Sequence, residues 1–341
     1  MEALPIVVVT HTSDVPVELD IVRDRLSGHA EIRVVPIVNR PPTHQEEDEF
    51  IKAIKDARVI FQRPGFISRK MIESCPELKF IITHGAGVDK IDLKACAERD
   101  LWVANVPGGN ATAVAELAVA GILVLSRRLM IANAVLHSGG WSEGRFVGRE
   151  LSEGVLGLMG VGYVGRRMVE LVSGFGTKVL FYDPYLANEV AEDLRAQGAT
   201  RCASPEEILS RSDYISIHVP LTKETDKCIG LPEFRKMKRA GIIVNTSRGN
   251  VIDEEAMCVA LAEGIIAGAV LDVFAVEPLP ADSPLRKLDN VILTPHIGGS
   301  TQDCLRRIAR RACEDILVFL SGKRPVGLVE LSGKMNLSSR V

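Results

Sequence analysis

Gly160-Val161-Gly162-Tyr163-Val164-Gly165 is the stretch that decides the fold of this chain. The apolar run Val155–Met159 comes directly before it and predicts a strand, and apolar side chains recur at helical spacing after it. A G-x-G-x-x-G loop that joins a strand to a helix is typical of the first βα turn of a dinucleotide-binding unit. The loop therefore predicts an α/β domain built on a parallel sheet.

Two features around this loop predict its ligand. Glycines let backbone N–H groups approach a pyrophosphate at the positive end of a helix. Asp183 ends the next predicted strand, 18 residues after Gly165, and its carboxylate would bind the adenosine ribose and repel a 2′-phosphate. This pattern predicts NAD rather than NADP, and a structural turn with a surface Asp is the alternative interpretation. The residues expected to contact the cofactor here are Gly160, Gly162, Tyr163, Val164, Gly165 and Asp183.

Apolar runs alternate with helical periodicity along the whole chain, which indicates repeated βα units. Strands are predicted in an early series, Pro5–Val9, Ile32–Val35, Val59–Phe61, Phe80–Thr83 and Trp102–Ala104. A later series of six follows, Val155–Met159, Lys178–Tyr182, Tyr214–Val219, Ile242–Asn245, Ala267–Val273 and Val291–Thr294. Helices are expected over Val17–Leu26, Glu47–Ile54 and, packed on a core, Thr301–Leu320. The fold class is therefore α/β, with two doubly wound parallel-sheet domains.

Length and composition support this interpretation. A chain of 341 residues has room for about two domains of ~150 residues. Its 46% hydrophobic and 25% charged residues exclude a disordered or fibrous chain, and a net charge of −3 argues against binding to nucleic acid or an anionic membrane. Seven scattered cysteines without a C-x-x-C pair predict a reduced, cytoplasmic compartment, no disulfide frame and no metal site.

Two apolar segments of the sequence could be taken for a signal peptide or a membrane-spanning helix, but neither has the features of one. Leu4–Val9 has no basic region before it, so we expect a first strand rather than a signal peptide, and no export. Ala111–Leu136 predicts one long apolar helix, but Glu116 and Arg127 leave only ten uncharged residues between them, against the ~20 that a spanning helix needs. We expect this helix to be buried or to lie at a subunit interface.

Three polar residues follow predicted strands of the later series, where open α/β sheets bind their ligands. Arg248 could hold a carboxylate and polarise a carbonyl, and His296 could protonate the alkoxide that forms when a keto acid accepts hydride. Glu277 could hold one tautomer of that histidine. Each has an ordinary structural explanation if taken alone.

The order of several motifs adds a resemblance that spacing alone does not supply. The sequence resembles the D-isomer-specific 2-hydroxyacid dehydrogenase family from about residue 55 to residue 322. The motifs that carry the resemblance, besides the glycine loop, are His84-Gly85-Ala86-Gly87-Val88-Asp89, Asn105-Val106-Pro107-Gly108-Gly109-Asn110, His218-Val219-Pro220-Leu221-Thr222, Ser247-Arg248-Gly249, Asp272-Val273-Phe274 with Glu277-Pro278, and Pro295-His296-Ile297-Gly298.

The resemblance implies roles for individual residues. Arg248, Glu277 and His296 would be the catalytic set, and the backbone of Ala86, Gly87 and Val88 would hold the substrate carboxylate. Asp272 would bind the nicotinamide carboxamide, and Val219, Pro220, Thr246 and His296 would line the cofactor.

The resemblance also implies a domain arrangement. A discontinuous, flavodoxin-like substrate domain would comprise residues 1–104 and 297–341, and an NAD-binding Rossmann domain, residues 105–296, would be inserted in it. The cleft between them would close on substrate, and the helix that starts near Thr112 would help to form a homodimer. The return of the final helix to the first domain follows from the resemblance alone.

Substrate class is the least determined property. Relatives resembling phosphoglycerate dehydrogenase tend to carry Arg just before the Gly-x-Gly loop, where this chain has Thr83 and His84. Arg63 is then the available anion-binding residue, with Arg127 as a second from a neighbouring subunit. A single Arg suits a small keto acid such as hydroxypyruvate or glyoxylate better than a phosphorylated one.

Other functions stay open at this point. The alternatives are a 3-phosphoglycerate dehydrogenase and, from another class, an NAD-sensing corepressor that binds peptide partners. A formate or phosphite dehydrogenase is an alternative within the same fold. Formate is disfavoured, because formate enzymes of this kind have Gln where this chain has Glu277. Nucleic-acid binding is also disfavoured, since acidic residues flank the four arginines that share one face of the last helix, Arg306, Arg307, Arg310 and Arg311.

Overall fold

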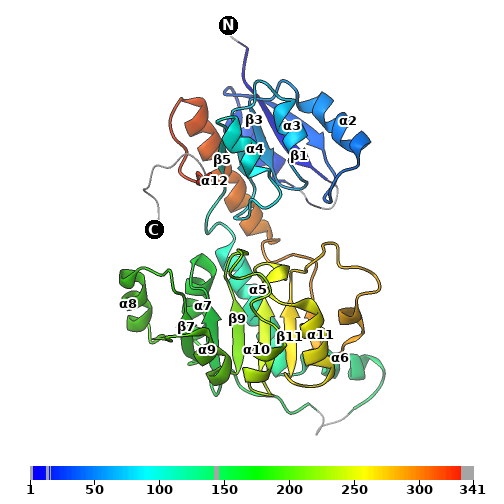
Figure 1. Ribbon diagram of the computed structural model, residues 1–341, viewed down its shortest axis with the longest axis vertical. Helices are drawn as coiled ribbons and strands as arrows, with labels where there is room; N and C mark the ends of the chain where they lie inside the picture. The colour runs from blue at the N-terminus through cyan, green and yellow to red at the C-terminus, as the bar shows by residue number, and fades with distance from the viewer. Residues whose placement is uncertain (1–2, 13–14, 16, 142–145, 332–341) are drawn as a thin grey trace. The chain divides into compact units, whose positions relative to one another are not determined.

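The computed structural model describes residues 3–12, 15, 17–141 and 146–331. The chain divides into two compact units, which we call unit 1 (residues 1–110 and 300–341) and unit 2 (residues 111–299) (Figure 1). The boundaries lie a few residues beyond the expected 104 and 296. The first boundary lies after residue 110 rather than after residue 104 because residues 107 and 109 are held on unit 1. Arg307 and Arg311 of the last helix donate hydrogen bonds to the carbonyls of Gly109 and Pro107.

Unit 1 contains a five-stranded sheet whose order is β2-β1-β3-β4-β5, with all pairs parallel. The strands are β1 (Ile6–His11), β2 (Glu31–Pro36), β3 (Val59–Gln62), β4 (Phe80–Thr83) and β5 (Trp102–Ala104). This is the flavodoxin-like order, in which the winding direction reverses between β1 and β3. Each predicted early strand is present, with ends that differ by no more than two residues.

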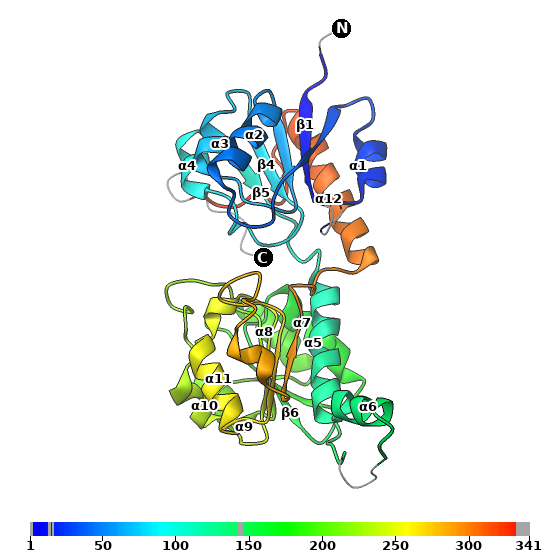
Figure 2. The same cartoon turned by 90° about the vertical axis from the view of Figure 1, so that its right-hand side faces the viewer.

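Helices cover both faces of the unit 1 sheet. One face carries α1 (Leu19–Leu26) and α12 (Gln302–Leu320), and the other carries α2 (His44–Ile54), α3 (Arg69–Glu73) and α4 (Leu93–Glu98) (Figure 2). The apolar side chains of Leu305, Ile308, Ala312 and Ile316 on the last helix are buried, and the partly buried Phe319 packs its ring 4.9 Å from the ring of Phe80 on β4. The last helix therefore belongs to the core of unit 1.

Unit 2 contains a seven-stranded parallel sheet, in the order β12-β11-β10-β9-β6-β7-β8. The strands are β6 (Val155–Met159), β7 (Lys178–Tyr182), β8 (Thr200–Arg201), β9 (Tyr214–Ile217), β10 (Ile242–Asn245), β11 (Gly268–Leu271) and β12 (Val291–Leu293). Six were predicted. The seventh, β8, was missed because its two residues have no apolar signal. The winding reverses between β6 and β9, which is where a dinucleotide binds in this topology.

Two helices of unit 2 pack on each other and on one face of the sheet, α5 (Ala111–Ser126) and α7 (Tyr163–Ser173) (Figure 2). The opposite face carries α9 (Pro205–Arg211), α10 (Leu231–Lys236) and α11 (Glu254–Ala262), while α8 (Asn188–Ala196) lies beside β8. Buried aliphatic side chains fill the space on both faces. The central strands β9, β10 and β11 are buried on both sides, which is typical of parallel sheets, and the edge strands β8 and β12 are partly exposed.

The prediction of one long helix over Ala111–Leu136 was wrong. The segment forms α5 and a separate helix, α6 (Leu129–His137), with Arg128 between them at φ +54°. The carbonyl of Ser126 accepts a hydrogen bond from the N–H of Arg149 instead of continuing the helix. No residue of α6 is buried. None of the described helices is long and apolar enough to cross a membrane.

Candidate functional site

The glycine loop begins where β6 ends and leads into α7. Gly160 has φ +86°, and a Cβ on it would lie 2.9 Å from the carbonyl oxygen of His218, just beyond β9. A Cβ on Gly165 would lie 2.5 Å from the carbonyl oxygen of Gly160. The turn and its packing therefore require glycine at both positions. Val219 also packs against this loop. A Cβ added to Gly160 would lie 3.0 Å from the Cγ1 atom of Val219.

Gly162 differs from these two glycines. It is the N-cap of α7, and a Cβ on it would meet no protein atom within 4 Å. Packing therefore gives no reason for glycine here, whereas a ligand that must approach the backbone at a helix N-terminus does. The residues present fit a dinucleotide, with its pyrophosphate at the first turn of α7.

Asp183 follows β7 and its carboxylate is held by the backbone on two sides. Oδ2 accepts a hydrogen bond from the N–H of Val161 in the glycine loop at 3.0 Å, and Oδ1 accepts one from the N–H of Tyr185 at 3.0 Å. Each carboxylate oxygen can accept a further hydrogen bond. Asp183 is thus fixed beside the loop with acceptor capacity left for a pair of ribose hydroxyls.

His296 and Glu277 in unit 2 form a hydrogen-bonded pair that is suited to acid–base catalysis. The Nδ1 of His296 lies 2.8 Å from Oε2 of Glu277, while Oε1 of the same carboxylate accepts a hydrogen bond from the N–H of Phe274 at 3.2 Å. Because a carboxylate only accepts, Nδ1 carries a proton and Nε2 is the nitrogen that can exchange one with a substrate. The imidazole is half-exposed, so a reactant can reach it.

Asp272, buried at the end of β11, shapes the loop that presents this histidine. Its carboxylate accepts hydrogen bonds from the hydroxyl of Thr294 and from the N–H groups of Ile297 and Gly298, at 2.6 to 2.8 Å. The N–H of His296 is bonded to the carbonyl of Asp272, and His296 has φ +54°, a rare conformation for a residue with a Cβ. The surrounding hydrogen bonds hold this strained backbone in place.

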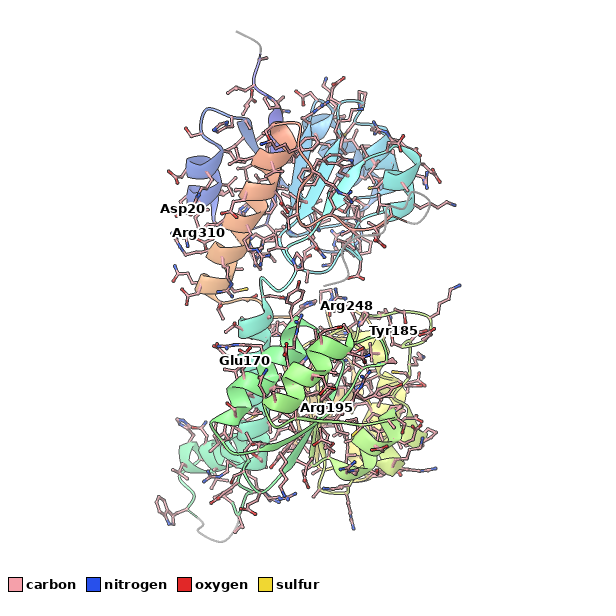
Figure 3. All side chains as sticks on the ribbon, turned by 90° about the vertical axis from the view of Figure 1, so that its left-hand side faces the viewer. Asp20, Glu170, Tyr185, Arg195, Arg248 and Arg310 are labelled. Atoms are coloured by element: carbon pink, nitrogen blue, oxygen red, sulfur yellow. The ribbon has the colours of Figure 1, made fainter. Side chains whose placement is uncertain are left out.

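Arg248 lies in the turn after β10. The buried side chain of Asn245 accepts hydrogen bonds from the N–H and hydroxyl of Ser247 and donates one to the carbonyl of Arg248. The guanidinium itself donates to the carbonyl of Ser247 at 2.7 Å. Figure 3 shows Arg248 and Tyr185 at the same end of unit 2, because both follow the carboxyl ends of strands in one parallel sheet. Asn245 is a residue whose role the sequence pattern did not reveal.

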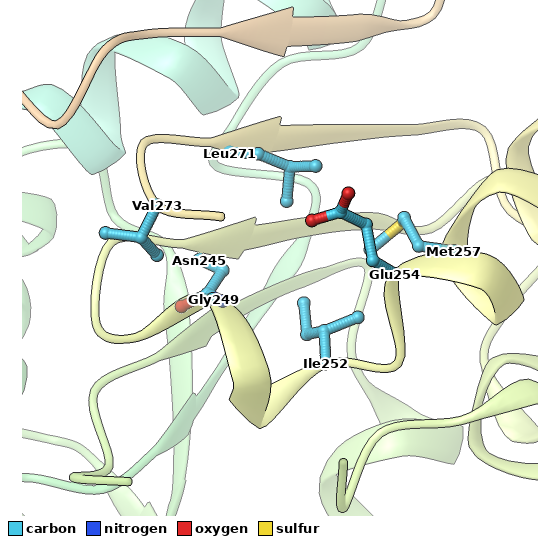
Figure 4. Close-up of a pocket in the computed structure, with 7 residues that line it drawn as sticks. All are labelled: Asn245, Gly249, Ile252, Glu254, Met257, Leu271 and Val273. Atoms are coloured by element: carbon cyan, nitrogen blue, oxygen red, sulfur yellow. The ribbon is translucent and has the colours of Figure 1, made fainter. Parts of the chain in front are cut away.

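Gly249 brings the Arg248 turn against the loop that carries Glu277. A Cβ on Gly249 would lie 1.9 Å from the carbonyl carbon of Phe274, so only glycine fits. On the other side, the Glu254 carboxylate accepts a hydrogen bond from the N–H of Ala275. Figure 4 shows Glu254 at the small pocket between these segments, whose volume of about 10 Å³ suffices for one water molecule. The pocket therefore serves packing rather than ligand binding.

Thr246, expected to line the cofactor, has a buried hydroxyl with no hydrogen-bond partner among the described residues. A buried hydroxyl left without a partner is costly, so this atom is available to a ligand. Pro220, expected to do the same, is exposed after β9.

In unit 1, the loop after β4 contains the predicted substrate-binding backbone of Ala86, Gly87 and Val88. Asn105 donates a hydrogen bond to the carbonyl of Ala86 at 2.6 Å, and the N–H of Val106 donates to the carbonyl of Gly85 at 2.8 Å. These bonds use carbonyl groups of the loop and fix its conformation.

Arg63 and His84 contact each other at the carboxyl ends of β3 and β4. Nη1 of Arg63 lies 2.9 Å from Nδ1 of His84, and Nε2 of His84 lies 3.2 Å from the carbonyl oxygen of Leu305 on α12. Burial, and then the neighbouring Arg63 charge, lower the pKa of His84 to about 3. Burial also lowers the pKa of Arg63. The sequence pointed to Arg63 but gave no sign of this pairing.

Three of the four arginines on this face of α12 are bound to other groups of unit 1, and the fourth, Arg310, is exposed. Arg306 forms ion pairs with Glu18 and Asp20, and Arg307 and Arg311 bind backbone carbonyls of unit 1. Within the described part of the chain, no cluster of three or more His, Cys, Asp or Glu residues could hold a metal ion.

A Rossmann sheet with this glycine loop, acidic residue and histidine–carboxylate pair defines an NAD-dependent oxidoreductase. The family model described as "D-isomer specific 2-hydroxyacid dehydrogenase, NAD binding domain" matches residues 119–298. The chain belongs to the D-isomer specific 2-hydroxyacid dehydrogenase family.

Individual relatives support this assignment. The chain is 39% identical to a glyoxylate reductase of Thermofilum pendens over 294 residues, which cover 85% of each chain. It is 40% identical to a D-3-phosphoglycerate dehydrogenase of Methanocaldococcus jannaschii over 286 residues, 84% of this chain but only 54% of that one, so it spans about half the length of that relative. The solved structure of a D-lactate dehydrogenase from Aquifex aeolicus with NAD and lactic acid has 30% identity and a TM-score of 0.79, and the match covers 93% of this chain and 96% of that one.

Proposed function

We propose that the protein is an NAD-dependent D-2-hydroxyacid dehydrogenase that reduces a small 2-keto acid, such as hydroxypyruvate or glyoxylate. One observation carries the proposal: the 2.8 Å contact between Nδ1 of His296 and the carboxylate of Glu277, which leaves Nε2 to a reactant. A proton donor held in one orientation is what the reduction of a carbonyl requires of the protein.

When bound, NADH supplies the hydride. His296 would protonate the carbonyl oxygen from Nε2 as negative charge develops on it, and Glu277 would stabilise the imidazolium and hold its ring in place. Arg248 would bind the substrate and draw electron density toward that oxygen. Gly160, Gly162, Tyr163, Val164, Gly165, Asp183, Val219, Pro220, Thr246 and Asp272 would hold the cofactor.

The substrate carboxylate would be held by the N–H groups of Ala86, Gly87 and Val88. Their loop is prepared for this role because its carbonyls are tied to residues 105 and 106. Arg63 adds a positive charge at the same strand ends, since β3 and β4 are neighbours whose pairing ends at Gln62 and Thr83.

A 3-phosphoglycerate dehydrogenase is the second candidate, favoured by the 40% identity to the Methanocaldococcus jannaschii enzyme. Against it, Thr83 is buried and neutral at a position just before the substrate loop. A phosphate would present about two negative charges, whereas in the described part of the chain Arg63 is the one cation that follows these two strands directly.

We also propose a homodimer and a reduced, cytoplasmic compartment. Leu129, Met130, Ile131 and Leu136 of α6 are each about half-exposed, which is unusual for so many apolar side chains on one helix. All seven cysteines are free, five of them buried.

Steady-state kinetics with NADH test the proposal. We expect kcat/KM for hydroxypyruvate or glyoxylate to exceed that for phosphohydroxypyruvate. A preference of tenfold or more for phosphohydroxypyruvate would favour the second candidate. NADH binding without turnover of any keto acid would contradict the enzymatic function and favour a corepressor-like protein.

A further inference from the structure

The contact between Arg63 and His84 is chemically unusual, because it joins a partly buried cation to a group that carries no negative charge. A buried guanidinium is normally paired with a carboxylate or bonded to several carbonyls. Among the described residues Arg63 has one side-chain hydrogen bond, to His84, and its buried Nε has no acceptor. Glu18 acts on it only through space, and that carboxylate is bound by Arg306.

The hydrogen bonds of His84 determine which ring nitrogen carries the proton. The Leu305 carbonyl can only accept, so Nε2 of His84 is the protonated nitrogen. Nδ1 is then bare and can accept from Nη1 of Arg63, whose guanidinium can only donate. The ring is therefore neutral, and α12 fixes the tautomer that receives the arginine.

The position of the pair in the fold is also that of a ligand site. Arg63 follows β3, beside the point between β1 and β3 where the winding of the unit 1 sheet reverses. Its N–H is bonded to the hydroxyl of Thr10 on β1 at 3.0 Å, so its backbone bridges the two strands there. Ligands of doubly wound sheets bind beyond the carboxyl ends of strands at this point.

We propose that His84 is a positioning residue that holds Arg63 so that the guanidinium binds the carboxylate of the keto acid, together with the backbone N–H groups of Ala86, Gly87 and Val88. The inference rests on the proposed function for the identity of the ligand. A carboxylate would supply a negative charge in direct hydrogen-bond contact, which none of the described residues provides, and it can accept two parallel hydrogen bonds from a guanidinium. Neutral His84 directs the cation without competing for it, as an Asp or Glu at this position would.

Two substitutions separate this role from a purely structural one. In His84→Asn, the amide oxygen can take the place of Nδ1, so the acceptor for Arg63 is kept and the bond to α12 is lost. In His84→Gln, the longer side chain can place its amide N–H where Nε2 was, so the bond to Leu305 is kept and the acceptor for Arg63 is lost. The two variants thus divide the functions of one ring.

We expect Arg63→Gln to raise KM for hydroxypyruvate by roughly 10- to 100-fold, the range that a hydrogen bond to a charged group supports, with kcat changed much less. His84→Gln should raise KM by several-fold with an unchanged melting temperature. His84→Asn should lower the melting temperature and leave KM within about twofold. Arg33→Gln is the control, because Arg33 pairs with Asp56 before β3, at the opposite end of that strand, and should leave KM unchanged.

The double variant decides the question. If His84 acts through Arg63, the KM of the double variant should be no more than about twice the KM of Arg63→Gln alone. Full additivity, or a larger rise in KM for His84→Asn than for His84→Gln, would overturn the proposal.

Calorimetric titration of the NADH-loaded chain with oxalate supplies a readout besides turnover. Weaker oxalate binding in Arg63→Gln and His84→Gln, but not in His84→Asn, supports binding of the carboxylate by Arg63 even if no keto acid is reduced, in which case only the proposed function fails. Equal oxalate affinity in all variants contradicts that binding even if the enzyme is active.

Discussion

The imidazole of His296 has one nitrogen bonded to Glu277, and the other is available to a substrate. If Nε2 supplies the proton, His296→Ala should lower kcat by ~10²–10⁴, the usual contribution of general acid catalysis. The dissociation constant for NADH, measured by fluorescence titration, should change little.

His29→Ala is a matched control for His296→Ala, because His29 is an exposed histidine of unit 1 with no role in the proposed reaction. Its kcat should equal that of the wild type. Retention of wild-type kcat by His296→Ala would show that another group donates the proton.

The role we propose for Asp183 is the choice between NADH and NADPH. Asp183→Ser removes the charge that repels a 2′-phosphate, so kcat/KM for NADPH should rise relative to that for NADH. The variant also loses an acceptor for the N–H of Val161, so NADH should bind more weakly. Equal kcat/KM for the two cofactors in the wild type would contradict this role.

Sequence reasoning at the residue scale could propose site residues where a residue type and its place after a strand already imply chemistry. Arg248, Glu277 and His296 were predicted this way, and the structure joins Glu277 to His296. The role of Asn245 and the partner of His84 were not predictable, because both depend on hydrogen bonds to backbone carbonyls whose positions only the folded chain defines.

At the scale of elements, Gly249 controls how closely the turn after β10 approaches the loop after β11. In Gly249→Ala the new methyl group would overlap the backbone of Phe274, and the two segments must separate. We expect a loss of stability of about 1–3 kcal/mol, as for other overpacked sites, and a fall in kcat as Arg248 and Glu277 move apart. Chemical denaturation and steady-state kinetics measure the two effects.

Gly174→Ala serves as the control for Gly249→Ala, because a Cβ at Gly174 would meet no atom within 4 Å. Its stability and kcat should match those of the wild type. Wild-type kcat in Gly249→Ala would show that the spacing of the two segments is unimportant for the reaction.

Elements were predictable where they are apolar and regular. Phe80–Thr83 and Val155–Met159 were predicted to the residue, because buried parallel strands are short continuous apolar runs. The break after Ser126 was not predicted, since its cause is a hydrogen bond from the distant Arg149. A two-residue strand such as Thr200–Arg201 carries no periodicity to detect.

For the whole molecule, two neutral histidines, the buried His84 and the partly buried His218, predict sensitivity to acid. The pKa of His84 is lowered to about 3 and that of His218 to about 4, chiefly by burial, whereas an unfolded histidine titrates near ~6.5. Below pH ~6.5 the unfolded chain binds protons that the folded chain does not. The free energy of unfolding is therefore highest above pH ~6.5 and decreases as the pH falls below that value. Each such proton lowers the free energy of unfolding by about 1.4 kcal/mol for every pH unit below ~6.5.

The variant His84→Asn lacks the titrating group at this position, so comparing it with the wild type measures the contribution of His84 alone. Between pH 7 and 5 the free energy of unfolding of the wild type should fall by about 2 kcal/mol more than that of the variant. Urea denaturation followed at both pH values measures this difference. Parallel curves for the two proteins would show that His84 is protonated in the folded state.

The insertion of unit 2 within unit 1 has a consequence during synthesis. A ribosome that adds roughly 5–20 residues per second needs roughly 10–40 s to pass from residue 110 to residue 300. Throughout that interval the sheet face that α12 will cover, including Phe80, is without its helix, and His84 has no Leu305 carbonyl to bind. The nascent chain therefore carries an uncovered apolar surface while unit 2 emerges.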